Sequence, residues 1–250
     1  MIGLITPTGA RQEQINLCQL WMSKQTYSGD VVWVIVDDAY PQTTNYITRP
    51  GWKIINVYPD PIWQSGENTQ ARNIAAGLNA LLSAYKREEI EAIFIIEDDD
   101  YYKPFYLERM MLRLNGFWAA GERHTIYYNV VTRRHVTNPN NYHSSLFQTA
   151  FKVEAIQELE NSLWHRFIDS EFWKNVKNGN LFNEGNLAIG IKGMAGRGGI
   201  GAGHKIAMNM QTDINLNYLK SQIGEDIKYY EQYYSGDRFA QHPAFIKRGH

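Results

Sequence analysis

The chain has 250 residues, of which 44% are hydrophobic and 13% aromatic, and its formal net charge is −1. This composition predicts a globular protein with a sizeable core and excludes a disordered chain. The near-neutral charge gives no overall attraction to nucleic acid or anionic membrane. A single cysteine, Cys18, excludes an internal disulfide and a cysteine-rich zinc site. Neither a signal peptide nor a run of membrane-spanning length is recognisable, so we expect a soluble cytoplasmic protein without membrane insertion.

The first half of the chain alternates predicted strands with predicted helices. Short apolar runs bounded by turn residues predict strands at 2–6, 31–36, 53–58 and 92–96. Apolar residues at helical spacing predict helices at 12–24 and 69–85, and Pro104 opens another helix that extends to about Leu114. Strands separated by helices indicate a mostly parallel, doubly wound α/β sheet.

The second half, after Gly121, predicts shorter and more varied elements. A hairpin is expected at 124–136, strands at 145–151 and 186–191, and helices at 153–161, 169–176, 214–222 and 225–234. The segment 193–204 is dense in glycine and predicts a loop. It formally contains the dinucleotide fingerprint Gly-X-Gly-X-X-Gly, but it lies late in the chain and does not open the first helix of a βαβ unit. We therefore discount a dinucleotide site.

Polar side chains follow three of the predicted strands. They are Thr6 to Gly9, the pair Asp37 and Asp38, and the four consecutive acids from Glu97 to Asp100. Because the carboxyl ends of parallel strands share one edge of a sheet, we expect these residues to line one site. Carboxylates this close stay ionised together when a positive group lies among them, and a hard divalent cation is the usual one. A solvated acidic turn without a ligand is the alternative.

The order of these motifs resembles that of the GT-A nucleotide-sugar glycosyltransferases, particularly their family-2-like inverting branch. The matching segments are ITPTGAR, VIVDDAY, TQARNIAAGLNALL, FIIEDDDYYKP, TAFKVEAI and FIDSEFWKNV, within about residues 1–177. The resemblance implies a Rossmann-like, mostly parallel central sheet flanked by helices, with a smaller acceptor-side sheet and C-terminal helices. It implies one domain over 1–250, with a nucleotide-sugar-binding half at 1–115 and an acceptor-binding half at 116–250 that includes the glycine-rich loop 193–203.

The resemblance also implies which residues bind the nucleotide. The expected contacts are Pro7, Thr8, Asp38, Arg72, Asp98 and Asp99. A carboxylate can accept hydrogen bonds from a base edge, while an arginine complements phosphate or a base carbonyl. The alternative for Arg72 is a surface helix residue paired with Glu67 or Glu88.

The four acids resemble the Asp-X-Asp motif that holds Mn²⁺ or Mg²⁺ in this family. Both Glu97-Asp98-Asp99 and Asp98-Asp99-Asp100 fit the motif. Side chains alternate along a strand, so Asp98 and Asp100 should share a face, and we expect these two as metal ligands. By the same resemblance, His204 is a candidate third ligand, although a lone histidine is more often a polar loop residue.

An acid at the start of a helix supplies the base in this family, and the segment IDSEFW matches that pattern. The resemblance implies Asp169 as the catalytic base, with Glu171 as the fallback. A purely structural role of Asp169 as a helix cap is the alternative. The basic residues Lys192, Arg197, His204 and Lys205 are expected to belong to a lid over the diphosphate.

Together these features predict a metal-dependent transfer of one sugar from a nucleotide diphosphate, with UDP as the expected nucleotide, and with inversion. The acceptor hydroxyl could belong to a glycan, a protein or a modified base in DNA. For DNA, Arg133, Arg134, His135 and the loop 192–205 would supply a local basic patch for phosphates. A nucleotidyltransferase is an alternative, but only Gly9 and Arg11 represent its glycine-rich basic signature. A non-catalytic nucleotide- or glycan-binding module is the other alternative.

Overall fold

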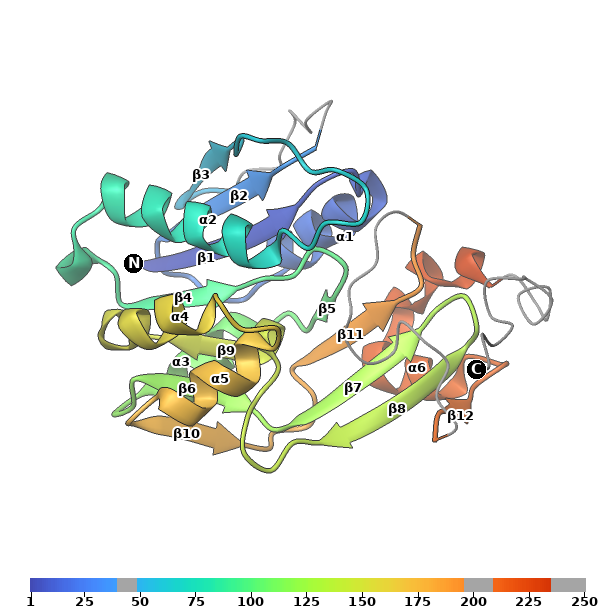
Figure 1. Ribbon diagram of the computed structural model, residues 1–250. Coiled ribbons are helices and arrows are strands. Elements are labelled where there is room, and N and C mark those ends of the chain that lie inside the picture. The colour runs from blue at the N-terminus through green and yellow to red at the C-terminus, as the bar shows by residue number, and fades with distance from the viewer. Residues whose placement is uncertain (40–48, 196–208, 235–250) are drawn as a thin grey trace, which may run out of the picture.

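A computed structural model of the chain describes residues 1–39, 49–195 and 209–234, which form two β-sheets (Figure 1). The larger sheet has seven strands in the order β10 (Gly179–Phe182), β6 (Ala119–Glu122), β9 (Thr149–Phe151), β4 (Ala92–Ile95), β1 (Ile2–Thr8), β2 (Val31–Asp37) and β3 (Trp52–Val57). Strand β9 is antiparallel to both neighbours, and the other neighbouring pairs are parallel. The predicted mostly parallel α/β sheet is therefore confirmed.

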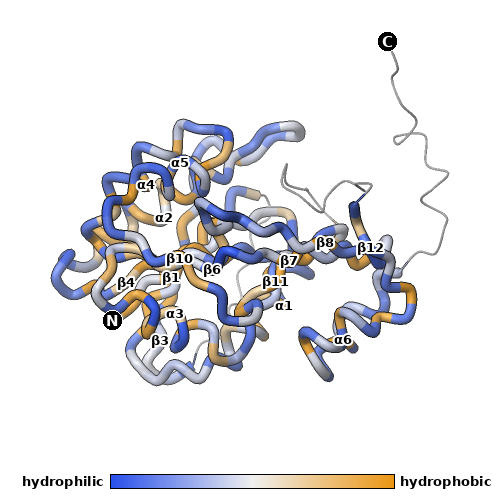
Figure 2. The backbone as a smooth tube through the Cα atoms, turned by 90° about the horizontal axis from the view of Figure 1, so that it is seen from below, coloured by the Kyte–Doolittle hydropathy of each residue, from blue (hydrophilic) through white to orange (hydrophobic). Residues whose placement is uncertain are grey.

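The smaller sheet continues from the larger one. Its order is β12 (Gln211–Thr212), β8 (Arg134–Pro139), β7 (His124–Asn129), β11 (Ala188–Lys192) and β5 (Tyr101–Tyr102). Figure 2 shows this sheet extending away from the larger one, with α6 (Asn217–Ile223) beside it. Tyr218 of α6 stacks on His135 of β8, with 3.5 Å between ring centroids. The helix is thus anchored to the outer part of the smaller sheet.

Helices cover both faces of the larger sheet because its strands are apolar on both sides. Alternate residues of β2, from Val31 to Val36, belong to two separate buried clusters. Helices α2 (Gln70–Ala84), α4 (Ile156–Ser162) and α5 (Ile168–Asn175) cover one face, and α1 (Gln12–Ser23) and α3 (Tyr106–Leu114) cover the other (Figure 1). A Cβ atom on Gly77 would lie 2.5 Å from Ile5 Cγ2, so the glycine allows α2 to approach β1 closely. Among the described residues, no helix has the length and apolar character needed to cross a membrane.

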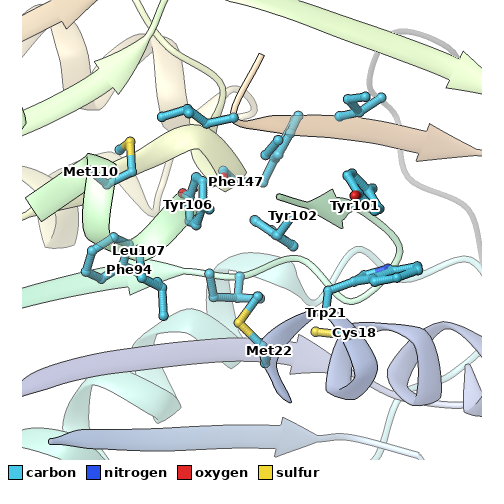
Figure 3. Close-up of a cluster of buried hydrophobic side chains, with 14 of the residues drawn as sticks. Cys18, Trp21, Met22, Phe94, Tyr101, Tyr102, Tyr106, Leu107, Met110 and Phe147 are labelled. Carbon is cyan, nitrogen blue, oxygen red and sulfur yellow. Dashed lines mark hydrogen bonds between the residues drawn. The ribbon is translucent and has the colours of Figure 1, made fainter. Parts of the chain in front are cut away.

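The cluster beneath α1 joins the two sheets. Figure 3 shows Cys18, Trp21 and Met22 of α1 beside aromatic residues of β5 and α3. The ring centroids of Trp21 and Tyr101 are 4.8 Å apart, and those of Tyr102 and Tyr106 are 4.9 Å apart. This aromatic packing fixes the segment after β4, which carries the acidic residues, against α1.

The structure corrects several predicted elements in the second half. The expected strand 145–151 is a 3₁₀ turn at Leu146–Gln148 followed by the short strand β9. The expected helix 225–234 is a pair of 3₁₀ turns, Gly224–Tyr229 and Glu231–Tyr233. Strands β5, β6, β10 and β12 were not predicted, because runs of two to four residues carry almost no periodicity. Two further 3₁₀ turns lie at Arg87–Glu89 and Val153–Ala155.

Candidate active site

The carboxyl ends of β1, β2 and β4 meet at one edge of the larger sheet, as predicted. Thr8 is paired with Asp37 across the β1–β2 ladder. The Thr8 hydroxyl donates a hydrogen bond of 2.7 Å to Asp98, and the Asp38 amide donates one of 3.3 Å to the Thr8 carbonyl. A pocket of about 770 Å³ opens at this edge, and Pro7 and Thr8 line it.

Asp38 is fully buried and is the centre of a hydrogen-bond network with the start of α2. Its Oδ2 atom accepts bonds from the Thr69 hydroxyl (2.5 Å), Arg72 (3.0 Å) and Asn73 (2.8 Å). Arg72 also donates to the Pro61 carbonyl at 2.7 Å. The structure therefore brings together Asp38 and Arg72, two of the expected nucleotide contacts, and among the described residues the carboxylate partner of Arg72 is Asp38 rather than Glu67 or Glu88. Thr69 and Asn73 belong to this network and also line the pocket.

The four acids lie in a turn, because β4 ends at Ile95. The alternation expected for a strand therefore does not apply to them. Asp98 is bound by Thr8 and by Arg11, whose Nη1 atom lies 2.9 Å from its Oδ1 atom. The same guanidinium contacts Asp99 at 2.7 Å. Arg11 thus connects the end of β1 to two of the acids.

Lys192 is the second cation of the acidic cluster. Its ammonium lies 2.8 Å from Asp100 Oδ1 and 3.5 Å from Asp99 Oδ2, and the residue is 4% exposed. The Ile191 amide donates to the same Asp100 oxygen at 3.0 Å. Burial lowers the pKa of Lys192, but the neighbouring carboxylates outweigh this effect and raise it above its ordinary range. Lys192 was predicted as a lid residue, but it is the last residue of strand β11 and one of the residues that line the pocket.

Glu97 lines the pocket beside these aspartates. Its Oε1 atom accepts a hydrogen bond of 3.0 Å from Gln70. Burial raises the pKa of Glu97 to about 7; Lys192 opposes the rise, and the charges of Asp99 and Asp169 add to it. Glu97 is therefore poised to lose its proton near neutral pH, and a nearby cation would favour the ionised form.

The acids could hold a divalent cation. Glu97, Asp99 and Asp100 each offer one carboxylate oxygen within 4.8 Å of the others. Asp100 Oδ2 is buried, and it has no hydrogen-bond partner within the part of the chain that the structure describes. Oxygen ligands of this kind suit Mn²⁺ or Mg²⁺. Asp98, expected as a ligand, lies outside this group, because Arg11 and Thr8 bind its two oxygens.

The structure places the two candidate bases differently. Helix α5 begins at Ile168, with Phe167 at the N-cap, so Asp169 is the second helical residue rather than the cap. Asp169 lines the pocket, its Oδ1 atom accepts the Ser170 amide at 2.8 Å, and burial raises its pKa. Glu171 is not one of the described residues that line the pocket; it accepts hydrogen bonds from Asn175 (3.0 Å) and Lys174 (3.4 Å).

Other predicted residues lie elsewhere or outside the described part. His135 is buried in the stack with Tyr218, and burial lowers its pKa, so it does not belong to a surface basic patch. The Arg133 guanidinium lies 4.0 Å from the Tyr234 ring centroid and donates to the Ile214 carbonyl. The remaining predicted lid residues and metal ligand, Arg197, His204 and Lys205, lie outside the described residues, as does most of the glycine-rich loop.

Several pocket residues were not predicted as site residues. They come from α2, β7, the 3₁₀ turn before β9 and the α4–α5 connection, and they are Gln70, Tyr127, Ser145, Phe147 and Arg166. The pairing of Arg11 with the acids was also missed. One signal was available: four clustered acids require nearby positive charge, and Arg11 follows a strand whose end meets theirs.

The larger sheet, with helices on both faces and polar residues at the carboxyl ends of its strands, has a GT-A-like α/β fold. No protein-family model matches the sequence, and no curated protein matches it. Among solved structures, S. aureus TarS 1–349 in complex with UDP-GlcNAc is similar, with a TM-score of 0.54 and 12% identity over 78% of this chain and 59% of the other. The mannosyltransferase PcManGT from Pyrobaculum calidifontis, in complex with GDP-Man and Mn²⁺, has a TM-score of 0.52 and 15% identity over 79% and 58%. The chain therefore spans about three fifths of the length of these structures, and the likeness confirms the predicted fold.

Proposed function

We propose that this protein is a metal-dependent glycosyltransferase that moves a sugar from a nucleotide diphosphate to an acceptor hydroxyl with inversion. One observation carries the proposal. A single pocket is lined by the acidic cluster Glu97–Asp99, by the cations Arg11 and Lys192, and by the carboxylate of Asp169. An acid–cation cluster suits a diphosphate with a metal ion, and a separate carboxylate suits proton abstraction from the acceptor.

The donor nucleotide is assigned to the half formed by residues 1–115. Pro7 and Thr8 line the pocket, and Asp38 holds Arg72 and Asn73 beside it. We take UDP as the nucleotide, although the similar structures bind either UDP-GlcNAc or GDP-Man. Asp98 and Asp99 are assigned to the nucleotide end of the pocket as well.

The metal site is assigned to Glu97, Asp99 and Asp100. When bound there, Mn²⁺ or Mg²⁺ would offset the negative charge that develops on the leaving nucleoside diphosphate. Arg11 and Lys192 add positive charge at the same end of the pocket. The residues that the structure describes thus supply both the oxygen ligands and the cations that such a leaving group needs.

Asp169 is assigned as the base that removes the proton of the acceptor hydroxyl as this hydroxyl attacks the anomeric carbon. Burial raises its pKa above the ordinary value of 3.8, which makes the carboxylate a stronger base. The base acts only when ionised, so the rate should fall on the acid side at a pH above that ordinary value. Arg166 and Phe167 line the pocket next to Asp169 and are assigned to the acceptor, a glycan or a modified base in DNA.

The proposal is tested by measuring release of UDP from a panel of UDP-sugars, with Mn²⁺ or with EDTA. Wild type and the exposed control variant Asp30→Asn should release UDP only with metal, and Asp100→Asn should release none. Circular dichroism and thermal unfolding establish whether Asp100→Asn retains the fold. Binding of UDP and Mn²⁺ without UDP release from any donor would identify a non-catalytic module, and release that is equally fast in EDTA would contradict the metal assignment.

A further inference from the structure

The acidic cluster already contains two cations of the chain itself. Asp98, Asp99 and Asp100 face Arg11 and Lys192, so two positive charges oppose three negative ones. Each of the three aspartates is at most 7% exposed. Buried carboxylates are costly unless they are paired, and here the pairing is internal.

Lys192 and a divalent cation would use the same aspartates. Asp99 and Asp100 contact the Lys192 ammonium, and the same two residues with Glu97 form the candidate metal group. Metal–oxygen distances are about 2.0–2.6 Å, and the ammonium lies 2.8 Å from Asp100 Oδ1. An ion bound to Asp100 would therefore lie within a few ångströms of a like charge, in a buried site where that repulsion is poorly screened.

We propose that the Lys192 ammonium is the resident counter-ion of the metal site in the free protein, and that a divalent cation binds tightly only together with a nucleotide diphosphate, which draws the ammonium away from Asp99 and Asp100. This inference rests on the proposed function of the pocket. It makes metal and nucleotide binding mutually dependent, because the diphosphate supplies the negative charge that a displaced lysine requires.

The surroundings of Lys192 allow this movement of the side chain without movement of the backbone. Strand β11 is held by its ladder with β7, and the Val130 amide donates to the Lys192 carbonyl at 2.9 Å. The ammonium lies 6.0 Å from the Tyr127 ring centroid and 5.9 Å from that of Phe147, and both rings line the pocket. A lysine stem has four methylene groups joined by rotatable bonds, so its ammonium can turn toward the pocket that these rings line.

Isothermal titration of Mn²⁺, alone and with saturating UDP, tests the proposal. In wild type, UDP should raise the Mn²⁺ affinity by about tenfold or more. Lys192→Met should bind Mn²⁺ alone about tenfold more tightly than wild type, and UDP should add less to its affinity. Lys192→Arg keeps the charge and should resemble wild type, as should the control Lys220→Met, whose side chain on α6 is 59% exposed. Equal or weaker binding of Mn²⁺ alone by Lys192→Met would overturn the proposal.

Thermal unfolding provides the second readout, because Lys192→Met leaves buried aspartates short of a positive charge and loses stability. Mn²⁺ alone should raise the Tm of Lys192→Met more than that of wild type. If the variant is unfolded without metal, Mn²⁺ should restore its circular dichroism spectrum, and a failure to do so would also overturn the proposal. Failure of the proposed function would be seen separately, as absent UDP release while the Mn²⁺ affinities keep the expected order.

Discussion

The two sides of the pocket differ in how firmly their side chains are fixed. On the side that we assign to the donor, Asp38, Asp98 and Asp100 are buried, and each accepts hydrogen bonds or forms ion pairs with other elements. On the side that we assign to the acceptor, the pocket residue Phe167 is 55% exposed, and Trp164, which belongs to the same connection but does not line the pocket, is 91% exposed. The donor side is therefore preorganised for charge, whereas the acceptor side presents open apolar surface beside the proposed base.

This difference follows from how each side is built. The donor side consists of the ends of β1, β2 and β4 and the first turn of α2, whose positions are set by the ladders and helix packing of the larger sheet. The acceptor side includes the connection between α4 and α5, which residues 163–167 form without regular structure. Changes on the donor side should thus affect stability and nucleotide binding together, while changes on the acceptor side should affect turnover or acceptor KM with little change in stability.

Asp169→Asn is expected to have the largest effect, and the effect should be confined to rate. Loss of the base should lower the rate by about 10²–10⁴-fold and leave the affinity for UDP and Mn²⁺ unchanged. Asparagine retains an oxygen for the Ser170 amide, so the free energy of unfolding should change little. Steady-state kinetics and UDP titration measure the two quantities.

Glu171→Gln is the matched control for that experiment. Glu171 lies two residues after Asp169 in α5, and it accepts a hydrogen bond from Asn175 rather than lining the pocket. We expect its activity to stay close to wild type. Full activity of Asp169→Asn together with an inactive Glu171→Gln would move the base to Glu171. Full activity of both variants would contradict the inverting mechanism.

Asp38→Ala should lower both stability and nucleotide affinity. It removes the carboxylate that Thr69, Arg72 and Asn73 share, and it leaves the Arg72 guanidinium without this partner. A cost of about 1–3 kcal/mol is expected, because the Thr69 and Asn73 donors lose a buried acceptor while the Arg72 side chain is 32% exposed. Asp38→Asn keeps an acceptor of the same shape and should cost less; chemical denaturation and UDP titration compare the two. An Asp38→Ala variant as stable as wild type would show that the donor side is less fixed than its bonds indicate.

The same contrast explains what the sequence could predict. The central strands of the larger sheet could be predicted from their apolar runs. Parallel strands place their carboxyl ends at one edge of a sheet, so Thr8, Asp38 and the acidic turn could be assigned to the same edge. The helix Gln70–Ala84 could likewise be predicted from the spacing of its apolar residues, although its contact between Arg72 and Asp38 was not predicted.

The remaining features depend on contacts between residues that are far apart in sequence. Lys192 meets Asp100 only because β11 of the smaller sheet pairs with β5, which directly follows the acids. Neither a two-residue strand nor this pairing leaves a periodic signal. The expected register of the metal ligands was based on the alternation of side chains along a strand, which does not apply here because β4 ends before Glu97 and a turn orients the acids.

Glu97→Gln should have a smaller effect that depends on pH. Burial raises the pKa of Glu97 from 4.5 to about 7 in the folded protein. Between pH 4.5 and about 7, Glu97 is therefore protonated in the folded state and ionised in the unfolded state. The stability of wild type should therefore fall, through this residue, as pH rises from about 4.5 to 7. In EDTA, the Tm of Glu97→Gln minus the Tm of wild type should increase as the pH rises from about 4.5 to 7 and then stay constant. The exposed control Glu88→Gln should show no such rise, and a flat difference for Glu97→Gln would contradict the buried, protonated state.

Phe167→Ala should have the smallest effect on the fold. The side chain is 55% exposed, and the Arg166 guanidinium lies 5.4 Å from its ring centroid. Substitutions at such surface positions change the free energy of unfolding by about 0.5 kcal/mol or less. Because Phe167 lines the pocket beside Asp169, the KM for the acceptor should nevertheless rise on the order of several-fold, while the KM for the donor stays constant.

Phe105→Ala is the control that gives this last prediction its meaning. Phe105 is 41% exposed, and it precedes α3 rather than lining the pocket. The two variants remove the same side chain at similar exposure, so a shared change in KM would reflect a general loss of surface and not an acceptor contact. A rise in acceptor KM for Phe167→Ala alone assigns the exposed face of the α4–α5 connection to the acceptor. No change in either variant would mean that the acceptor approaches Asp169 from another wall of the pocket. The two sides would then differ in the exposure of their side chains but not in the ligand that each one binds.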